Sequence, residues 1–340
     1  MKLQNTLTII LSTLIINNVY ADEPTTAKCN EAINQNAFST ALSLAEQSLK
    51  QNASDKDALI CKGRALSAMG DSAAAITSLT QAKKLTKEPF EQIIVEILMG
   101  NALRSADQTE QAISAYTQAA ALAKGQNNQN YERISFNQIG DTYFSKQQYS
   151  QALGAYEQAY KLTANDNERG ESYENIALTH HQLKDHNTAL AYQIKAYVTH
   201  EKVGSLDQYA HSSIELGRYY AIEKNYTAAE NVLNKIIKFA KEQGGAYFEA
   251  KGLSVLAKVK LAQGKQAEAD KLTAAAKKIA QDNKDVALGK EIDEETALAE
   301  ADAPANLRLM IANMKRDSGH KPRLAKHMIV NRDMRDSDDF

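Results

Sequence analysis

Small side chains recur at a regular interval along most of the chain, with polar, turn-like segments between them. Seven alanines that each follow such a segment are 34, 37, 40, 37, 40 and 40 residues apart. A small residue stands twelve positions before each of these alanines, and six of the seven copies carry another small residue seven positions after it. A period in this range predicts a solenoid of repeated helical hairpins. The alanines are Ala41, Ala75, Ala112, Ala152, Ala189, Ala229 and Ala269. The preceding small residues are Cys29, Gly63, Gly100, Gly140, Ala177, Gly217 and Ala257.

This pattern resembles the tetratricopeptide repeat over about residues 27–281. The resemblance implies an all-α, right-handed superhelical α-solenoid of about seven helical hairpins, followed by a C-terminal tail that is helical or partly disordered. It places Gly140, Ala152 and Ala159 where two antiparallel helices approach closely, and Tyr143 and Tyr156 in the space that the small residues leave. The regular spacing therefore serves packing rather than a reaction.

The pattern also divides the chain into segments. Residues 22–54, in which the first repeat has lost most of its large side chains, are expected to cap the array, and residues 55–282 form its main part. Polar clusters at 125–130 and 163–168 indicate breaks between repeats. Residues 283–340 form a charged tail. Within it, Leu307, Met310, Ile311 and Met314 share one face of a predicted helix over residues 305–315. That helix caps the last repeat, docks a partner, or belongs to a solvated tail.

Residues 1–21 have the features of a signal peptide. Lys2 precedes a largely apolar segment, Leu7 to Ile16, and Val19 and Ala21 are the small residues that a signal peptidase accepts before its cut. The alternative is an uncleaved membrane anchor, but the apolar segment is shorter than the roughly 20 residues that a bilayer requires. We expect an exported chain without stable membrane insertion after cleavage. The periplasm is the preferred location, and secretion is the alternative.

Export allows the two cysteines, Cys29 and Cys61, to pair. A bridge between them would close a loop of about 32 residues and stabilise the fold by about 3 to 4 kcal/mol through the entropy of the unfolded chain. The alternative is two unpaired cysteines acting as small apolar residues in separate helix interfaces.

Composition and motifs exclude several classes of function. A formal net charge of −2 gives no basic excess for binding nucleic acid. The nucleophilic serine turn, the zinc protease motif, the phosphate loop and the dinucleotide fingerprint are all absent, so we expect no catalytic residues and no cofactor. His180 and His181 point about 100° apart on a helix and cannot share one ion, and His211 lies at a different level, so we expect no metal site.

The resemblance instead implies binding of a protein or peptide partner along an inner groove lined by the first helix of each repeat. The expected function is an exported adaptor that holds a peptide or a helix in this groove. The alternatives are a periplasmic chaperone or assembly factor that shields client segments, and a peptide-sensing regulator. Carried over residue by residue, the expected groove contains Arg64, Ile97, Asn101, Arg104, Asn137, Asp141, Phe144, Glu174, Leu178, His181, Ile214, Arg218 and Lys258.

Overall fold

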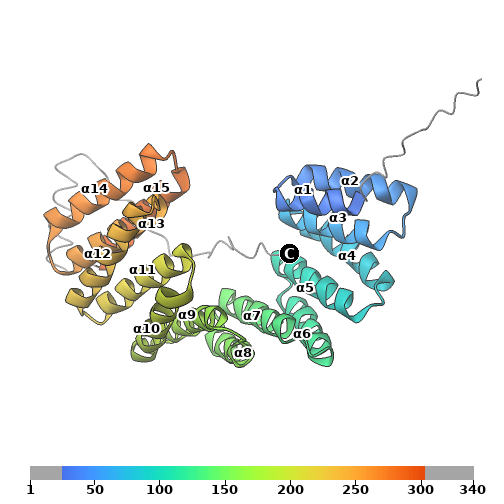
Figure 1. Cartoon of the computed structure of the whole chain (residues 1–340), viewed down its shortest axis with the longest axis horizontal. Coiled ribbons are helices and arrows are strands. Elements are labelled where there is room, and N and C mark those ends of the chain that lie inside the picture. Colours follow the sequence, from blue (N-terminus) through green and yellow to red (C-terminus); the bar gives the residue numbers. More distant parts are fainter. Residues whose placement is uncertain (1–24, 303–340) are drawn as a thin grey trace, which may run out of the picture. The chain divides into compact units, whose positions relative to one another are not determined.

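The computed structural model describes residues 25–302, and within this range the chain forms fifteen α-helices and no strand (Figure 1). The predicted signal peptide and the predicted helix over residues 305–315 lie outside the described residues. The all-helical hairpin fold expected from the sequence is confirmed. The helices are α1 (Thr25–Asn34), α2 (Phe38–Gln51), α3 (Lys56–Ala68), α4 (Ser72–Leu85), α5 (Pro89–Ser105), α6 (Thr109–Gly125), α7 (Gln129–Ser145), α8 (Tyr149–Lys161), α9 (Asp166–Gln182), α10 (His186–Val203), α11 (Leu206–Ile222), α12 (Tyr226–Glu242), α13 (Ala246–Ala262), α14 (Gln266–Asp282) and α15 (Val286–Asp302).

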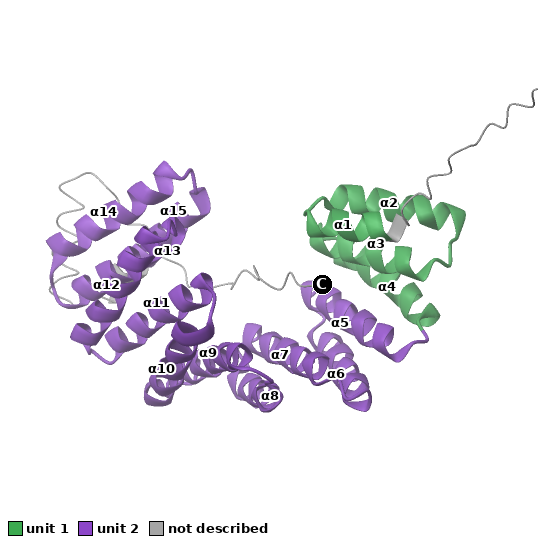
Figure 2. Cartoon of the chain, viewed as in Figure 1, with its two compact units in different colours: residues 1–86 green, residues 87–340 purple. Residues whose placement is uncertain are grey.

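The helices fall into two compact units, residues 1–86 and residues 87–340 (Figure 2). The first unit holds α1 to α4, which form two hairpins, and the second holds α5 to α14, which form five, followed by α15. The repeat spacing predicts one array over residues 55–282 and gives no sign of a division after Thr86. In each unit the consecutive helices pack against one another in pairs, as in a helical-hairpin repeat.

Each hairpin closes through a three-residue link whose middle residue has a positive φ. Between α7 and α8 this residue is Gln147, at φ 60°, and its backbone N–H donates to the carbonyl of Phe144 at 2.9 Å. The next N–H, that of Gln148, donates to Tyr143, also at 2.9 Å. These bonds satisfy carbonyls at the helix end that would otherwise lack partners. Only Gly70 and Gly264 supply glycine at this position, and the other hairpins use a polar residue.

The polar clusters that indicate repeat boundaries do separate hairpins. Asn128, in the first cluster, precedes α7, and its side chain accepts a hydrogen bond from the N–H of Tyr131. Asn165, in the second cluster, caps α9 in the same way through the N–H of Glu168. An asparagine side chain at this position satisfies one of the free N–H groups of the first turn, which explains why both helices begin there.

The recurring small residues lie at the closest approaches between helices. A side-chain carbon added to Gly140 would lie 2.5 Å from the ring of Tyr156, and one added to Gly63 or Gly217 would lie 2.6 Å from Leu79 or Leu233. The side chain of Tyr116 covers Gly100 in the same manner. The seven repeat alanines and Ala159 are buried: Ala269 is 5% exposed, and Ala41, Ala75, Ala112, Ala152, Ala159, Ala189 and Ala229 are 0% exposed.

Helix α15 lies in the acid-rich segment that the sequence analysis assigns to the tail. Its residues Leu288 and Ile292 are buried against Ala250 of α13 and against Ala276 and Ala280 of α14. These two apolar residues, one turn apart, are hard to recognise among the six acidic residues of this helix. The described array therefore consists of seven hairpins followed by one more helix, α15, in the position of the first helix of a hairpin.

Candidate functional site

The first helices of the hairpins in the second unit form a continuous row. Helix α5 packs on α7, α11 packs on α13, and α13 packs on α15. Arg133 of α7 forms an ion pair of 3.4 Å with Glu168 of α9, and Gln208 of α11 donates a hydrogen bond of 3.1 Å to Glu171 of α9. Most of the predicted groove residues lie on these helices and are partly exposed. We call this set the first-helix surface. They are Ile97, Asn101, Arg104, Asn137, Asp141, Phe144, Leu178, His181, Arg218 and Lys258.

Three other predicted groove residues lie elsewhere. Glu174 and Ile214 are 9% and 4% exposed, so their side chains belong to the interior and not to a surface open to a partner. Ile214 packs in the core around α11, α12 and α13. Arg64 belongs to α3 in the first unit, where its guanidinium donates to Asn30 of α1 at 2.9 Å.

Two polar residues of the first-helix surface are fixed by tyrosines at equivalent points in neighbouring hairpins. The hydroxyl of Tyr116 in α6 donates to Asn101 of α5 at 2.6 Å, and that of Tyr156 in α8 donates to Asp141 of α7 at 2.6 Å. Burial raises the pKa of Tyr116 well above its usual value, so this tyrosine stays a hydrogen-bond donor. Asn101 and Asp141 each keep further hydrogen-bonding capacity. The arrangement holds two polar groups in a defined orientation on adjacent first helices.

The surface ends in an ion-pair network around Arg218. This guanidinium donates to Glu215 on its own helix at 3.0 Å and forms two hydrogen bonds with Glu295 of α15. Burial would raise the pKa of Glu295, but Arg218, Lys251 and Lys258 outweigh burial and hold the pKa of this carboxyl below its usual value. Arg218 is therefore engaged within the chain, whereas Lys258 remains partly exposed beside this network.

A second polar cluster connects α7, α9 and α10, and the sequence analysis does not anticipate it. His200 of α10 is 1% exposed and lies with its Nδ1 atom 3.5 Å from a carboxylate oxygen of Glu174. Burial raises the pKa of the neighbouring Glu171, although Arg133 and His200 act in the opposite direction. The ring of His200 occupies the space above Gly170, where a side-chain carbon would collide with it. In the sequence, the signal for this cluster is Gly170, a glycine that lies in no obvious turn.

The histidines near the α9–α10 link are arranged in two ways. His180 stacks on Tyr192, with ring centroids 5.9 Å apart, and forms a 3.3 Å contact with Asp185, so it acts as a packing residue. His181 lies edge to face with Tyr219 and has its Nδ1 atom 3.1 Å from the Nδ1 atom of His186. The short link between α9 and α10 brings His181 and His186 together.

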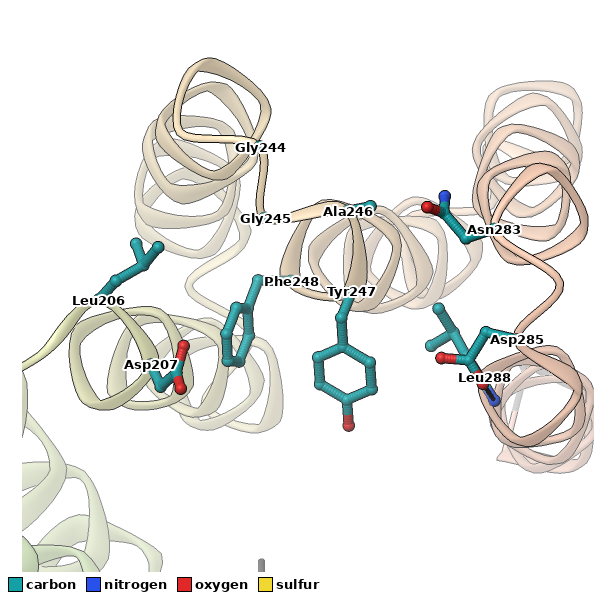
Figure 3. A pocket seen from close by; sticks show the side chains of 10 residues that line it. All are labelled: Leu206, Asp207, Gly244, Gly245, Ala246, Tyr247, Phe248, Asn283, Asp285 and Leu288. Carbon is teal, nitrogen blue, oxygen red and sulfur yellow. Dashed lines mark hydrogen bonds between the residues drawn. The ribbon is translucent and has the colours of Figure 1, made fainter. Parts of the chain in front are cut away.

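A pocket of about 350 Å³ lies at the amino-terminal ends of α11, α13 and α15 (Figure 3). Tyr247 and Phe248 project side by side from the start of α13, and Asp207 of α11 faces Phe248. The carboxylate of Asp285 caps α15 by accepting from the N–H of Leu288 at 2.9 Å. This pocket contains none of the residues predicted to bind a partner. Its lining is Leu206, Asp207, Gly244, Gly245, Ala246, Tyr247, Phe248, Asn283, Asp285 and Leu288.

Between residues 25 and 302, no three or more histidine, cysteine, aspartate or glutamate side chains are grouped so that they could hold a metal ion. Among the helices of the same range, none combines the length and the apolar character needed to cross a membrane.

Comparison with solved structures shows the fold. The apo form of RapI matches with a TM-score of 0.63 at 15% identity, over 86% of this chain and 86% of that chain. Aspartyl phosphate phosphatase F from Bacillus subtilis matches with a TM-score of 0.56 at 14% identity, over 92% of this chain and 87% of that chain. A putative kinesin light chain with TPR-like repeats, from Podosopora anserina, matches with a TM-score of 0.51 at 15% identity, over 58% and 99%.

Comparison with sequences identifies the repeat. A search of curated proteins found no significant match. The model of the Tetratricopeptide repeat family matches residues 91–165 and residues 168–242, which correspond to α5 to α8 and α9 to α12. This repeat is a protein-interaction fold. Over these two segments the comparison confirms the repeat that the spacing of small residues predicts, because both segments match the Tetratricopeptide repeat model.

Proposed function

We propose that the chain is an exported interaction module, without catalytic activity, that binds a peptide or a helix of a protein partner on the first-helix surface. The observation that supports this proposal most directly is the pair of tyrosine-fixed residues, Asn101 and Asp141. They occupy the same place in consecutive hairpins and retain unused hydrogen-bonding capacity. Polar groups that are already oriented lose less entropy when a partner binds.

Apolar side chains accompany these polar groups. Ile97 lies one turn before Asn101, and Phe144 lies one turn after Asp141, and both side chains are partly exposed. The ring of Phe144 is held by Tyr149, with centroids 5.2 Å apart. A partner segment that places an apolar residue beside a hydrogen-bonding group would match this alternation, with apolar contacts adding affinity and polar contacts fixing the register.

Site-specific photocrosslinking in the native host tests the proposed surface. A photoreactive phenylalanine analogue at Phe144 should capture one partner in near-stoichiometric amount, whereas the same analogue at Glu157, an exposed residue of α8, should not. Charge reversal at Arg104 should weaken the crosslink at Phe144. Equal capture at both positions would contradict the proposal. Many clients that share exposed apolar segments would instead support the chaperone alternative, for which Ile97, Phe144 and Leu178 would matter most.

Export is the second part of the proposal. The pairing of Cys29 with Cys61 supports it, because disulfides persist in oxidising compartments. Mass spectrometry of the protein purified from its host should find Asp22 as the first residue, and osmotic-shock fractionation should release the protein from the periplasm. A mature protein that retains the sequence of residues 1–21, or one that stays with the cytoplasmic fraction, would contradict export.

A further inference from the structure

Two imidazoles face each other through ring nitrogens at the link between α9 and α10. His181 lies in the last turn of α9 and His186 is the first residue of α10. The two Nδ1 atoms are 3.1 Å apart, and the ring centroids are 5.0 Å apart with the planes inclined by 49°. Asp185 caps α10 by accepting from the N–H of Thr188, and Lys184 at φ 67° closes the link, so the backbone holds the two histidines at the two ends of a short turn.

The spacing of these nitrogens suits a shared metal ion. A transition metal binds imidazole nitrogen at about 2.0 to 2.1 Å, so two such ligands lie roughly 2.9 Å apart at a right angle and roughly 3.3 Å apart at the tetrahedral angle. The observed 3.1 Å falls between these limits. A hydrogen bond from one Nδ1–H to the other ring would have a similar length. The distance therefore permits both arrangements, and metal titration separates them.

Packing limits the movement of the first ring. The ring packs against Tyr219, which limits its rotation. An imidazole that is already oriented loses less rotamer freedom when it binds a metal ion.

We propose that His181 and His186 form a binding site for a divalent transition-metal ion such as Zn²⁺, with both Nδ1 atoms as ligands. Since the described residues offer no third histidine, cysteine or carboxylate ligand within such a group, the remaining coordination positions are open to water or to a ligand from outside the chain. His181 belongs to the first-helix surface, so the open positions lie at its edge.

Nearby charges indicate which outside ligand the ion would take. Glu215 favours positive charge at His181, whereas Lys184 and Lys258 oppose it. Because two lysines act against one carboxylate, the site gains most from an ion whose charge is partly neutralised by an anionic ligand. A carboxylate, of a small molecule or of a peptide, is therefore the class of additional ligand that the site favours.

Calorimetric titration with Zn²⁺ tests this site in the mature chain prepared without a polyhistidine tag. The native protein should bind one ion per chain, and His181→Gln or His186→Gln should each weaken binding at least tenfold. His180→Gln and His211→Gln are the matched controls and should change affinity less than twofold. Mg²⁺, which prefers oxygen ligands, should give no signal. Circular dichroism should show that all four variants keep the helical fold.

Cobalt substitution gives an independent readout. Co²⁺ bound to two imidazoles should produce visible absorption bands that shift when acetate is added and that are absent in His186→Gln. No binding of Zn²⁺ by the native chain, or equal binding by His186→Gln, would overturn the proposal and leave a hydrogen bond between the two rings. The photocrosslink at Phe144 is measured on the native chain without added metal, so failure of the metal site is distinguishable from failure of the proposed function.

Discussion

The hydroxyl of Tyr156 donates a 2.6 Å hydrogen bond to Asp141, while the ring of the same tyrosine covers Gly140. One side chain thus fills the gap between two helices and fixes a residue of the neighbouring first-helix surface. Tyr116 and Asn101 repeat the relationship one hairpin earlier. Packing and the orientation of the first-helix surface are therefore linked in these two hairpins, because the residue after the glycine depends on the tyrosine for its orientation.

Hairpins with leucine at the tyrosine position differ in the residue after the glycine. Leu79 and Leu233 pack over Gly63 and Gly217, and the following residues are Arg64 and Arg218, which bond to carboxylate or amide oxygens elsewhere. Without a phenol to donate a hydrogen bond, an acceptor at this position would have no partner in the second helix. In these four hairpins, the type of polar residue that follows the glycine therefore depends on whether a tyrosine or a leucine packs over that glycine.

Gly140→Ala should destabilise the second unit. The added methyl group would lie 2.5 Å from the ring of Tyr156, and overpacking of this kind costs about 1 to 3 kcal/mol. Gly154→Ala in α8 is the control, because nothing lies within 4 Å of the added carbon and alanine favours a helix by up to about 1 kcal/mol. Urea denaturation followed by circular dichroism should show opposite shifts of the midpoint. Equal shifts would contradict the close approach at Gly140.

Tyr156→Phe tests the hydrogen bond without removing the ring. The variant should lose about 1 kcal/mol of stability, since the buried ring stays in place and one hydrogen bond is lost. The free energy of partner binding should weaken by more than the free energy of unfolding does, because Asp141 loses its fixed orientation. The measurement pairs denaturation midpoints with the crosslinking yield at Phe144. An unchanged yield would mean that Asp141 does not contribute to binding.

Much of the fold follows from residues that are visible in the sequence. Glycine and alanine recur wherever helices touch, since a larger side chain would hold the helices apart, and Gly140 and Ala152 reveal a hairpin without any structural knowledge. Contacts formed across a link or between hairpins are different. His181 and His186 meet only because the link between α9 and α10 closes as it does, and Glu295 finds Arg218 only after α15 docks on α13. Periodicity carries no signal for such pairs.

Glu295→Gln should weaken the docking of α15 and change its pH dependence. The substitution removes a charge-assisted bond to Arg218, for an expected loss of about 1 to 3 kcal/mol at pH 7. The pKa of a glutamate in an unfolded chain is about 4.3. Because burial is outweighed by Arg218 and the folded pKa lies lower, this stabilisation is present above the unfolded pKa and is lost as the pH falls through the folded pKa.

The corresponding experiment follows hydrogen exchange in α15 between pH 7 and pH 3, with rates corrected for intrinsic exchange. Native and Glu295→Gln proteins should differ most at pH 7 and converge at the acid end. Glu294→Gln, which removes an exposed carboxylate 3.7 Å from Lys290, should match the native protein within a few tenths of a kcal/mol. A difference that persists undiminished at pH 3 would show that the charge of Glu295 is not the cause.

Reduction of the bond between Cys29 and Cys61 should destabilise the first unit selectively. The cysteines join α1 to α3, with Cα atoms 6.4 Å apart and 32 positions between them in sequence, and closing a loop of this size stabilises by about 3 to 4 kcal/mol. Both side chains lie in an apolar cluster with Ala41 and Ala65, so the double variant Cys29→Ala/Cys61→Ala should keep the packing and lose only the link.

Hydrogen exchange with and without dithiothreitol separates the two contributions. In the native protein the reductant should speed exchange in α1 to α4 and leave α9 to α14 unchanged, because the link constrains only the first unit. In the double variant the first unit should already exchange fast, and the reductant should have no further effect. If reduction leaves exchange in the native first unit unchanged, the apolar cluster alone accounts for the stability of this unit. The cysteines then act only as small packing residues.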